Sequence, residues 1–303
     1  MPEIVLHEVG LRDGLQVERA VVPTPTKLQW AERLARSGVD LLQLGSFVHR
    51  EKVPQMADTA ELFAAFAGRS GGPRLTALVL NEKGLERGLA CGVRYFCLGV
   101  SASDTHSRKN TGMNTAEALT RIVAIANSAR TAGAEVQVSV QSAFGCGYEG
   151  EVPAARVLDL ASRFLDAGLR TVSLADTAGH ATPDQVERLF GAVRGLDAQV
   201  VCACHLHDTY GLGIANAVAA LRAGVTSFET AVAGLGGCPF TKVAGGNVCT
   251  EDFVHLLHRL GHRPDVTLDP ILEVACDIEA FLGRDLPGRV HKTGPIPRLP
   301  AGA

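Results

Sequence analysis

Two histidines separated by one residue, His205 and His207, are the side chains whose types and spacing most clearly suggest chemistry. In a strand, residues i and i+2 point to the same face, so both imidazoles can reach one cation. Asp13 would add an anionic oxygen and Asn247 a carbonyl oxygen, which leaves positions open for substrate or water. This set favours Mg²⁺ or Mn²⁺ over structural Zn²⁺, although the spacing also fits Fe²⁺. By itself, a His-x-His pair is equally well explained by two ordinary hydrogen-bonded histidines.

Two further charged residues are candidates for catalysis. Arg12 precedes Asp13 and would place a fixed positive charge beside the expected cation, where enolate charge could develop. An isolated Arg-Asp pair is otherwise usually a surface ion pair that contributes little. Asp176, in the segment LADTAGHATP, fits a functional carboxylate at a strand end and the N-cap of the next helix equally well.

Three segments have weaker indications of function. The glycine-rich stretch from Gly234 to Phe240 is typical of a loop that approaches or covers a ligand, and Cys238 lies at its tip. Residues 108–110, Arg-Lys-Asn, are expected in a loop that is either simply solvated or binds phosphate groups. Residues 250–252, Thr-Glu-Asp, are explained as the start of a helix.

A recurring pattern predicts the elements that position these residues. A helical stretch ends in a small residue plus glycine, and a run rich in Val, Leu and Ile follows at once. Glycine suits the left-handed position after a helix, and the apolar runs are typical of parallel strands buried on both faces. The junctions are Ser37-Gly38, Cys91-Gly92, Ala132-Gly133, Ala167-Gly168 and Ala223-Gly224.

Three more strand-like runs, near residues 4, 74 and 200, bring the predicted strands to eight. Eight alternating βα units predict an α/β fold of the closed (β/α)8 TIM-barrel type rather than an open sheet. Active sites of such barrels lie at the C-terminal ends of the strands, which is where the four candidate ligands fall. We expect a catalytic barrel over residues 1–262 and a C-terminal helical extension with a Pro-rich tail, residues 263–303, packed on it.

Composition narrows the class of protein. The chain has 303 residues, enough for one barrel of about 250 residues with an extension. Only 5% of its residues are aromatic, the net charge is -3 and the basic residues are scattered, so we expect neither nucleic acid nor a membrane surface as a partner. Eight cysteines without a C-x-x-C pair, and no signal-like N-terminus, predict a cytoplasmic protein with reduced thiols.

Five sequence blocks, in order along the chain, resemble the signature blocks of the 3-hydroxy-3-methylglutaryl-CoA lyase family. The last block is especially specific, and together the blocks fall between about residues 3 and 260. They are EVGLRDGLQ (8–16), SFVHREKVPQMAD (46–58), SLADTAGHATP (173–183), HLHDTYGLGIAN (205–216) and AGLGGCPFTKVAGGNVCTED (233–252).

The resemblance implies three groups of functional residues. The ligands of one divalent cation, Mg²⁺ or Mn²⁺, would be Asp13, His205, His207 and Asn247. The catalytic residues would be Arg12 for the enolate, His205 for proton transfer, Cys238 in the loop, and Asp13 and Asp176 in the same cluster. The substrate would contact Arg12, Gln16, Gln43, Ser46 and Thr177.

The resemblance further implies a lyase that cleaves a 3-hydroxy-acyl-CoA, either 3-hydroxy-3-methylglutaryl-CoA or a close analogue. A base would remove the proton of the tertiary hydroxyl, and the carbon-carbon bond would break to give an acetyl-CoA enolate and a keto acid such as acetoacetate. This activity would belong to leucine degradation. Barrel lyases of this kind are often dimers, so a homodimer is expected by analogy.

The chain departs from the family pattern at five positions, two of which, Val243 and Gly246, alter the last block. Gln43 stands where the family has a glutamate, Gly45 where a larger residue is usual, and Leu11 where a proline is usual. A neutral amide beside a charged site leads to the hypothesis of a different acyl group, as in citramalyl-CoA or a longer branched 3-hydroxyglutaryl-CoA.

Two other functions are weaker alternatives. Claisen-condensing synthases use a related barrel but carry long C-terminal regions, whereas only a short extension is expected here. A barrel that binds an acyl-CoA without cleaving it is disfavoured because every candidate ligand is present.

Overall fold

The computed structural model describes residues 4–237 and 245–297, and in that part of the chain eight parallel strands close into a barrel. Neighbours in the sheet follow chain order, and β1 pairs with both β2 and β8, which confirms the predicted closed barrel. The strands are β1 Val5–Glu8, β2 Leu41–Ser46, β3 Arg74–Leu78, β4 Tyr95–Ser101, β5 Glu135–Gln141, β6 Thr171–Asp176, β7 Val201–Leu206 and β8 Ser227–Thr230.

The strands form where the sequence has continuous apolar runs, since helices cover their outer faces. Every residue of β2 and β4 is buried. The glycines at the predicted helix-to-strand junctions adopt the left-handed backbone expected of them, as at Gly38 with φ 93° and Gly168 with φ 76°. The recurring pattern is therefore correctly explained by helix termination before each strand.

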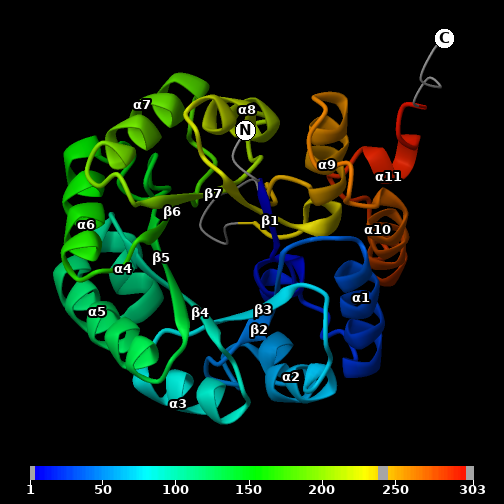
Figure 1. Cartoon of the computed structure of the whole chain (residues 1–303), viewed down its shortest axis with the longest axis horizontal. Helices are drawn as coiled ribbons and strands as arrows, with labels where there is room; N and C mark the ends of the chain where they lie inside the picture. The colour runs from blue at the N-terminus through cyan, green and yellow to red at the C-terminus, as the bar shows by residue number, and fades with distance from the viewer. Residues whose placement is uncertain (1–3, 238–244, 298–303) are drawn as a thin grey trace.

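A ring of helices surrounds the strands (Figure 1). Two helices, α4 and α5, follow β4, so residues 108–110 lie in a helix and the prediction of a loop there is wrong. The ring helices are α1 Thr24–Arg36, α2 Thr59–Phe66, α3 Glu82–Ala90, α4 Asp104–Thr111, α5 Thr115–Thr131, α6 Ala154–Asp166, α7 Pro183–Arg194, α8 Gly213–Arg222 and α9 Thr250–Arg259.

The C-terminal segment contributes α10, Leu268–Leu282, and the short α11, Val290–Thr293. In Figure 1, α10 lies between α9 and α1 and fills the ring where the barrel begins and ends. Trp30 of α1 packs edge-on against Phe281 of α10, with ring centroids 5.9 Å apart. Helix α10 thus packs against the ring of helices, while the division into a barrel of residues 1–262 and an extension of residues 263–303 stays a prediction. No helix of the described residues has the length and apolarity needed to cross a membrane.

A layer of polar side chains fills the barrel interior below its C-terminal rim. His7 Nε2 of β1 is 2.8 Å from Thr76 Oγ1 of β3, and Gln137 of β5 donates through its amide nitrogen to Glu229 Oε1 of β8. His7 Nδ1 lies 3.6 Å from the same Glu229 oxygen. All four side chains are buried, so the floor beneath the site is polar.

Candidate active site

Asp13, His205 and His207 come together at the C-terminal rim of the barrel, with their ligand atoms within 4.8 Å of one another. Asp13 Oδ2 is 3.9 Å from Nε2 of each histidine, and the two Nε2 atoms are 3.2 Å apart. Asn247 joins them, because its Nδ2 donates to Asp13 Oδ2 at 2.8 Å across 234 positions of sequence. The structure therefore brings together the four residues expected to bind a cation.

The backbone around this cluster explains why these side chains converge. A single π-turn, η1 Gly10–Gly14, follows β1 and carries Asp13, whose amide donates to Val9 O at 2.8 Å. His205 is the penultimate residue of β7, and His207 pairs with Asn247 in an isolated antiparallel bridge. Gly236 allows the close approach, because a Cβ there would lie 2.5 Å from Asn247 Nδ2.

Burial and mutual charge set the protonation of the cluster. Burial alone would raise the pKa of the Asp13 carboxyl, but the positive charges of Arg12 and the two histidines lower it to about 2. Burial and repulsion from His205 lower the pKa of His207 to about 4. At neutral pH the cluster thus has an anionic carboxylate and a neutral imidazole, which are the forms that bind a cation.

The environment of Asn247 fits a metal site. Its Oδ1 atom is buried and, among the described residues, has no hydrogen-bond partner, although its Nδ2 makes two hydrogen bonds. Buried acceptors without a partner are rare in proteins and need an explanation such as an ion. A carboxylate oxygen, two imidazole nitrogens and this amide oxygen are suitable donors for a divalent cation of the Mg²⁺ or Mn²⁺ type.

Arg12 and two glutamine side chains adjoin the cluster. Arg12 Nη1 donates to Asp13 Oδ1 at 2.8 Å, and its Nε donates to Gln43 Oε1. Gln16 Nε2 donates to Asp13 Oδ1 at 3.2 Å. Because the Arg12 and Asp13 side chains are each only 12% exposed, the surface ion-pair interpretation is wrong. Gln43, the departure from the family glutamate, contacts the very guanidinium expected to stabilise an enolate.

Asp176 closes β6 and is buried. It accepts hydrogen bonds from the amides of His180 and Ala181 at 2.8 and 3.1 Å, and burial raises its pKa to about 6. The N-cap interpretation of Asp176 is wrong, because Thr182 caps α7 in a capping box with Gln185.

The remaining predicted residues lie at three different places. Thr177 follows β6, and its Oγ1 accepts from the amide of Ser142 at 2.9 Å. Ser46 ends β2, and its buried Oγ has no hydrogen-bond partner among the described residues. Cys238 lies outside the described residues.

The structure adds Glu229, which sequence reasoning missed. Its Oε2 is 2.8 Å from His205 Nδ1, on the side of the ring opposite the cluster. Burial would raise the pKa of Glu229, but the hydrogen bond from His205 and the proximity of His7 lower it well below its usual value. Conversely, burial would lower the pKa of His205, and the hydrogen bond and charge of Glu229 raise it. The available signal was a carboxylate within a strand predicted to be buried on both faces.

Glu8 is a second buried carboxylate that sequence reasoning missed. Its Oε1 accepts from the amides of Gly10 at 2.6 Å and Val232 at 3.1 Å, and its Oε2 accepts from Thr250 Oγ1. Burial raises its pKa to about 7. Glu8 therefore joins the turn carrying Asp13 to the turn after β8. Thr250 does begin α9, as predicted, but its hydroxyl serves this network, and Cys249 is the N-cap.

Gly45, the other informative departure, is explained by packing. The register between β2 and β3 shifts between Gln43 and Gly45. A Cβ at residue 45 would lie 2.3 Å from Thr59 Oγ1 in α2. A larger residue at this position would clash with α2. Gly45 therefore allows β2 and α2 to pack closely and does not face the cluster.

Comparisons with known proteins agree with this geometry. A family model described as HMGL-like matches residues 3–278. Hydroxymethylglutaryl-CoA lyase of Bacillus subtilis is 37% identical over 287 residues, which cover 95% of this chain and 96% of that protein. (R)-citramalyl-CoA lyase of Chloroflexus aurantiacus is 37% identical over 305 residues, covering 98% and 96%. The structure of an HMG-CoA lyase from Acinetobacter baumannii in complex with coenzyme A and 3-methylmalate superposes with a TM-score of 0.90, at 33% identity and 98% coverage of each chain.

Proposed function

Because the chain belongs to the HMGL-like family, we propose that it cleaves 3-hydroxy-3-methylglutaryl-CoA, or a close 3-hydroxy-acyl-CoA analogue, to acetyl-CoA and a keto acid. The chain is an enzyme of the carbon-carbon lyase class. The observation that supports the proposal most directly is the cluster of Asp13, His205 and His207 with the unpartnered Asn247 oxygen beside Arg12.

We propose that these four residues hold Mg²⁺ or Mn²⁺, which would polarise the substrate oxygens and acidify the hydroxyl group. His205 is the proton-transfer residue in this proposal, supported by its raised pKa and its contact with Glu229. Arg12 stabilises the negative charge that develops on the thioester oxygen when the bond breaks. Asp176, buried near His205, lowers the energy of the imidazolium form.

The proposed substrate contacts surround this cluster. Arg12, Gln16 and Gln43 form a continuous hydrogen-bonded group with Asp13, on one side of the site. The unpartnered Ser46 hydroxyl is suited to a substrate carboxylate, and Thr177 is its proposed counterpart across the rim. Cys238 is proposed to support turnover from the loop after β8.

The wider setting is also a proposal. We propose a cytoplasmic homodimer that acts in leucine degradation, on the basis of sequence composition and analogy. Equilibrium sedimentation of the purified protein tests the dimer, and growth of a deletion strain on leucine tests the pathway.

Citramalyl-CoA is a second candidate substrate. Gln43 removes a negative charge beside Arg12, and a relative with that activity is as similar as the hydroxymethylglutaryl-CoA lyase. Citramalyl-CoA lacks one methylene of the glutaryl chain, so its carboxylate is attached directly to the carbon that carries the hydroxyl group. Product identity separates the candidates, because citramalyl-CoA yields pyruvate rather than acetoacetate.

The deciding experiment offers the purified protein, with Mg²⁺ or Mn²⁺, 3-hydroxy-3-methylglutaryl-CoA, both enantiomers of citramalyl-CoA and longer branched analogues. We expect acetyl-CoA release that a chelator abolishes and added cation restores. His207→Ala is the matched inactive variant, because it removes one proposed ligand. Absence of acetyl-CoA from every substrate, or full activity after rigorous cation removal, would refute the proposal.

A further inference from the structure

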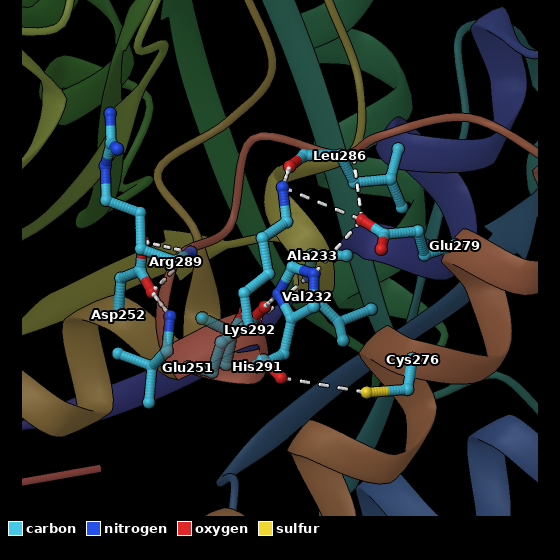
Figure 2. Close-up of polar contacts among 12 residues, drawn as sticks. Val232, Ala233, Glu251, Asp252, Cys276, Glu279, Leu286, Arg289, His291 and Lys292 are labelled. Carbon is cyan, nitrogen blue, oxygen red and sulfur yellow. Dashed lines mark hydrogen bonds and ion pairs between the residues drawn. The ribbon is translucent and has the colours of Figure 1, made fainter. Parts of the chain in front are cut away.

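The C-terminal segment of residues 286–292, called here the clasp, contacts the first turn of α9 through several polar groups (Figure 2). The amides of Arg289 and Val290 donate to Asp252 Oδ1 at 3.0 and 2.8 Å. The amide of Leu286 donates to Glu279 Oε2 of α10 at 2.9 Å. The clasp therefore packs against the start of α9, the helix that follows the loop with Asn247.

His291 is the central side chain of the clasp. Its Nδ1 lies 2.9 Å from Glu251 Oε1 and its Nε2 lies 3.2 Å from Glu279 Oε2. The side chains of His291 and Glu251 are only 2% and 0% exposed. A ring with a carboxylate at each nitrogen is suited to the doubly protonated form, which compensates the buried charge of Glu251.

Glu251 transmits this contact to the turn after β8. Its Oε2 accepts from the amide of Ala233 at 3.0 Å, and the amide of Gly288 in the clasp donates to Ala233 O at 3.2 Å. Ala233 has φ 60° and ψ 10°, a left-handed conformation that a non-glycine residue keeps only when its surroundings hold it. Glu251 therefore contacts His291 through Oε1 and this turn through Oε2.

The turn leads directly to the proposed cation site. The carbonyl of Leu235 accepts from both the backbone amide and the Nδ2 of Asn247, at 3.1 and 3.0 Å. These two bonds orient the Asn247 side chain, so that Nδ2 faces Asp13 and Oδ1 is left for a ligand. A shift of the Ala233 turn would rotate this amide.

We propose that His291 is a positioning residue for the cation site, acting through Glu251 and the Ala233 turn on the orientation of Asn247. The inference rests on the proposed function for the cation, but it concerns a residue distant from the reacting atoms. It differs from simple stabilisation of the C-terminus because it links the clasp to cation affinity.

The test compares His291→Ala with Lys292→Ala. Lys292 is a matched control, because it belongs to the same clasp and shares the Glu279 carboxylate with His291, at 3.7 Å, but bonds Asp285 and Leu286 O rather than Glu251. The Mn²⁺ dissociation constant is measured by calorimetry without substrate, and hydrogen exchange is followed in peptides covering residues 231–235. We expect about tenfold weaker Mn²⁺ binding and faster exchange in His291→Ala, at the lower end of effects for residues that orient ligands. Lys292→Ala should match the wild type in both.

A rescue variant separates positioning from general loss of stability. In His291→Ala/Glu251→Gln the unpaired buried charge is gone, while the amide oxygen can still accept from Ala233, so Mn²⁺ affinity should recover toward the wild type. If His291→Ala does not fold, His291→Gln, which keeps one donor, is measured in the same way. If a folded His291 variant has the Mn²⁺ affinity and the hydrogen exchange of the wild type, the inference about His291 is wrong and the proposed function is unaffected. Wild-type protein that binds no Mn²⁺ would overturn the proposed function as well.

Discussion

Glu229 Oε2 lies 2.8 Å from His205 Nδ1, while Nε2 of the same ring faces Asp13 at 3.9 Å. The two ring nitrogens therefore have separate tasks. Glu229 accepts a hydrogen bond from Nδ1–H, which leaves the Nε2 lone pair for the cluster. Gln137 and His7 in turn hold Glu229 from the barrel interior. The orientation of the proposed ligand His205 in β7 is thus set by Glu229 of the neighbouring strand β8.

Replacing Glu229 by Gln should weaken cation binding. A neutral amide oxygen is a poorer acceptor for Nδ1–H than a carboxylate, so the ring loses both orientation and basicity. We expect Mn²⁺ affinity about tenfold lower, within the range found for outer-shell partners of metal ligands. Titration calorimetry of substrate-free protein measures it.

The matched control is Asp58→Asn, which alters a buried ion pair with Lys27, 2.8 Å apart, away from the cluster. It should lower thermal stability and leave Mn²⁺ affinity unchanged. Equal affinities in wild type and Glu229→Gln would show that Glu229 has no part in cation binding.

Arg12→Gln should separate catalysis from cation binding. The guanidinium is proposed to act only as negative charge develops, so kcat should fall by about 10²- to 10³-fold. Mn²⁺ should bind equally well or more tightly, because a positive charge beside Asp13 has been removed. Steady-state kinetics and calorimetry are compared with Arg121→Gln, which alters an exposed ion pair with Glu82. Loss of cation binding together with kcat would contradict this division of roles.

Gly45→Ala should destabilise the protein without changing which thioester it prefers. The new Cβ would lie 2.3 Å from Thr59 Oγ1, an overpacking that costs about 1–3 kcal/mol in the free energy of unfolding. Urea denaturation measures the cost, and Gly45→Ala/Thr59→Ala should recover part of it. A changed ratio of kcat/KM between acyl-CoA substrates would instead place residue 45 in the specificity pocket.

The clasp should make stability depend on pH. The hydrogen bond with Glu251 raises the pKa of His291 above its ordinary value of 6.5. The stabilisation is therefore fully present below pH 6.5 and is lost as the pH rises through the higher pKa of the folded state. The difference in unfolding free energy between wild type and His291→Gln should shrink over that interval. Denaturation at a series of pH values measures it; a constant difference would exclude protonation of His291 as the cause. Glu8, whose pKa is raised to about 7 by burial, titrates in both proteins and cancels.

The sequence by itself determined the barrel and the four proposed ligands. Repeated helix-glycine-strand junctions are local signals, because helix termination and strand burial depend on residues close in the chain. The spacing of His205 and His207 was likewise informative, since alternate residues of a strand share a face. Barrel topology then placed strand ends at a common rim, which was enough to predict that Asp13 and Asn247 would lie beside the histidines.

Only the tertiary structure decided which buried charges support that site. Glu8, Glu229 and Glu251 lie in or beside elements whose local pattern indicates nothing more than a strand or a helix start. Their partners are Thr250, His205 and His291, respectively. Glu8 and Thr250 are 242 positions apart in the sequence, and Glu251 and His291 are 40 apart. A buried carboxylate is stable only when such a partner contacts it. Whether the partner lies close enough depends on how the sheet closes and where the C-terminal segment packs.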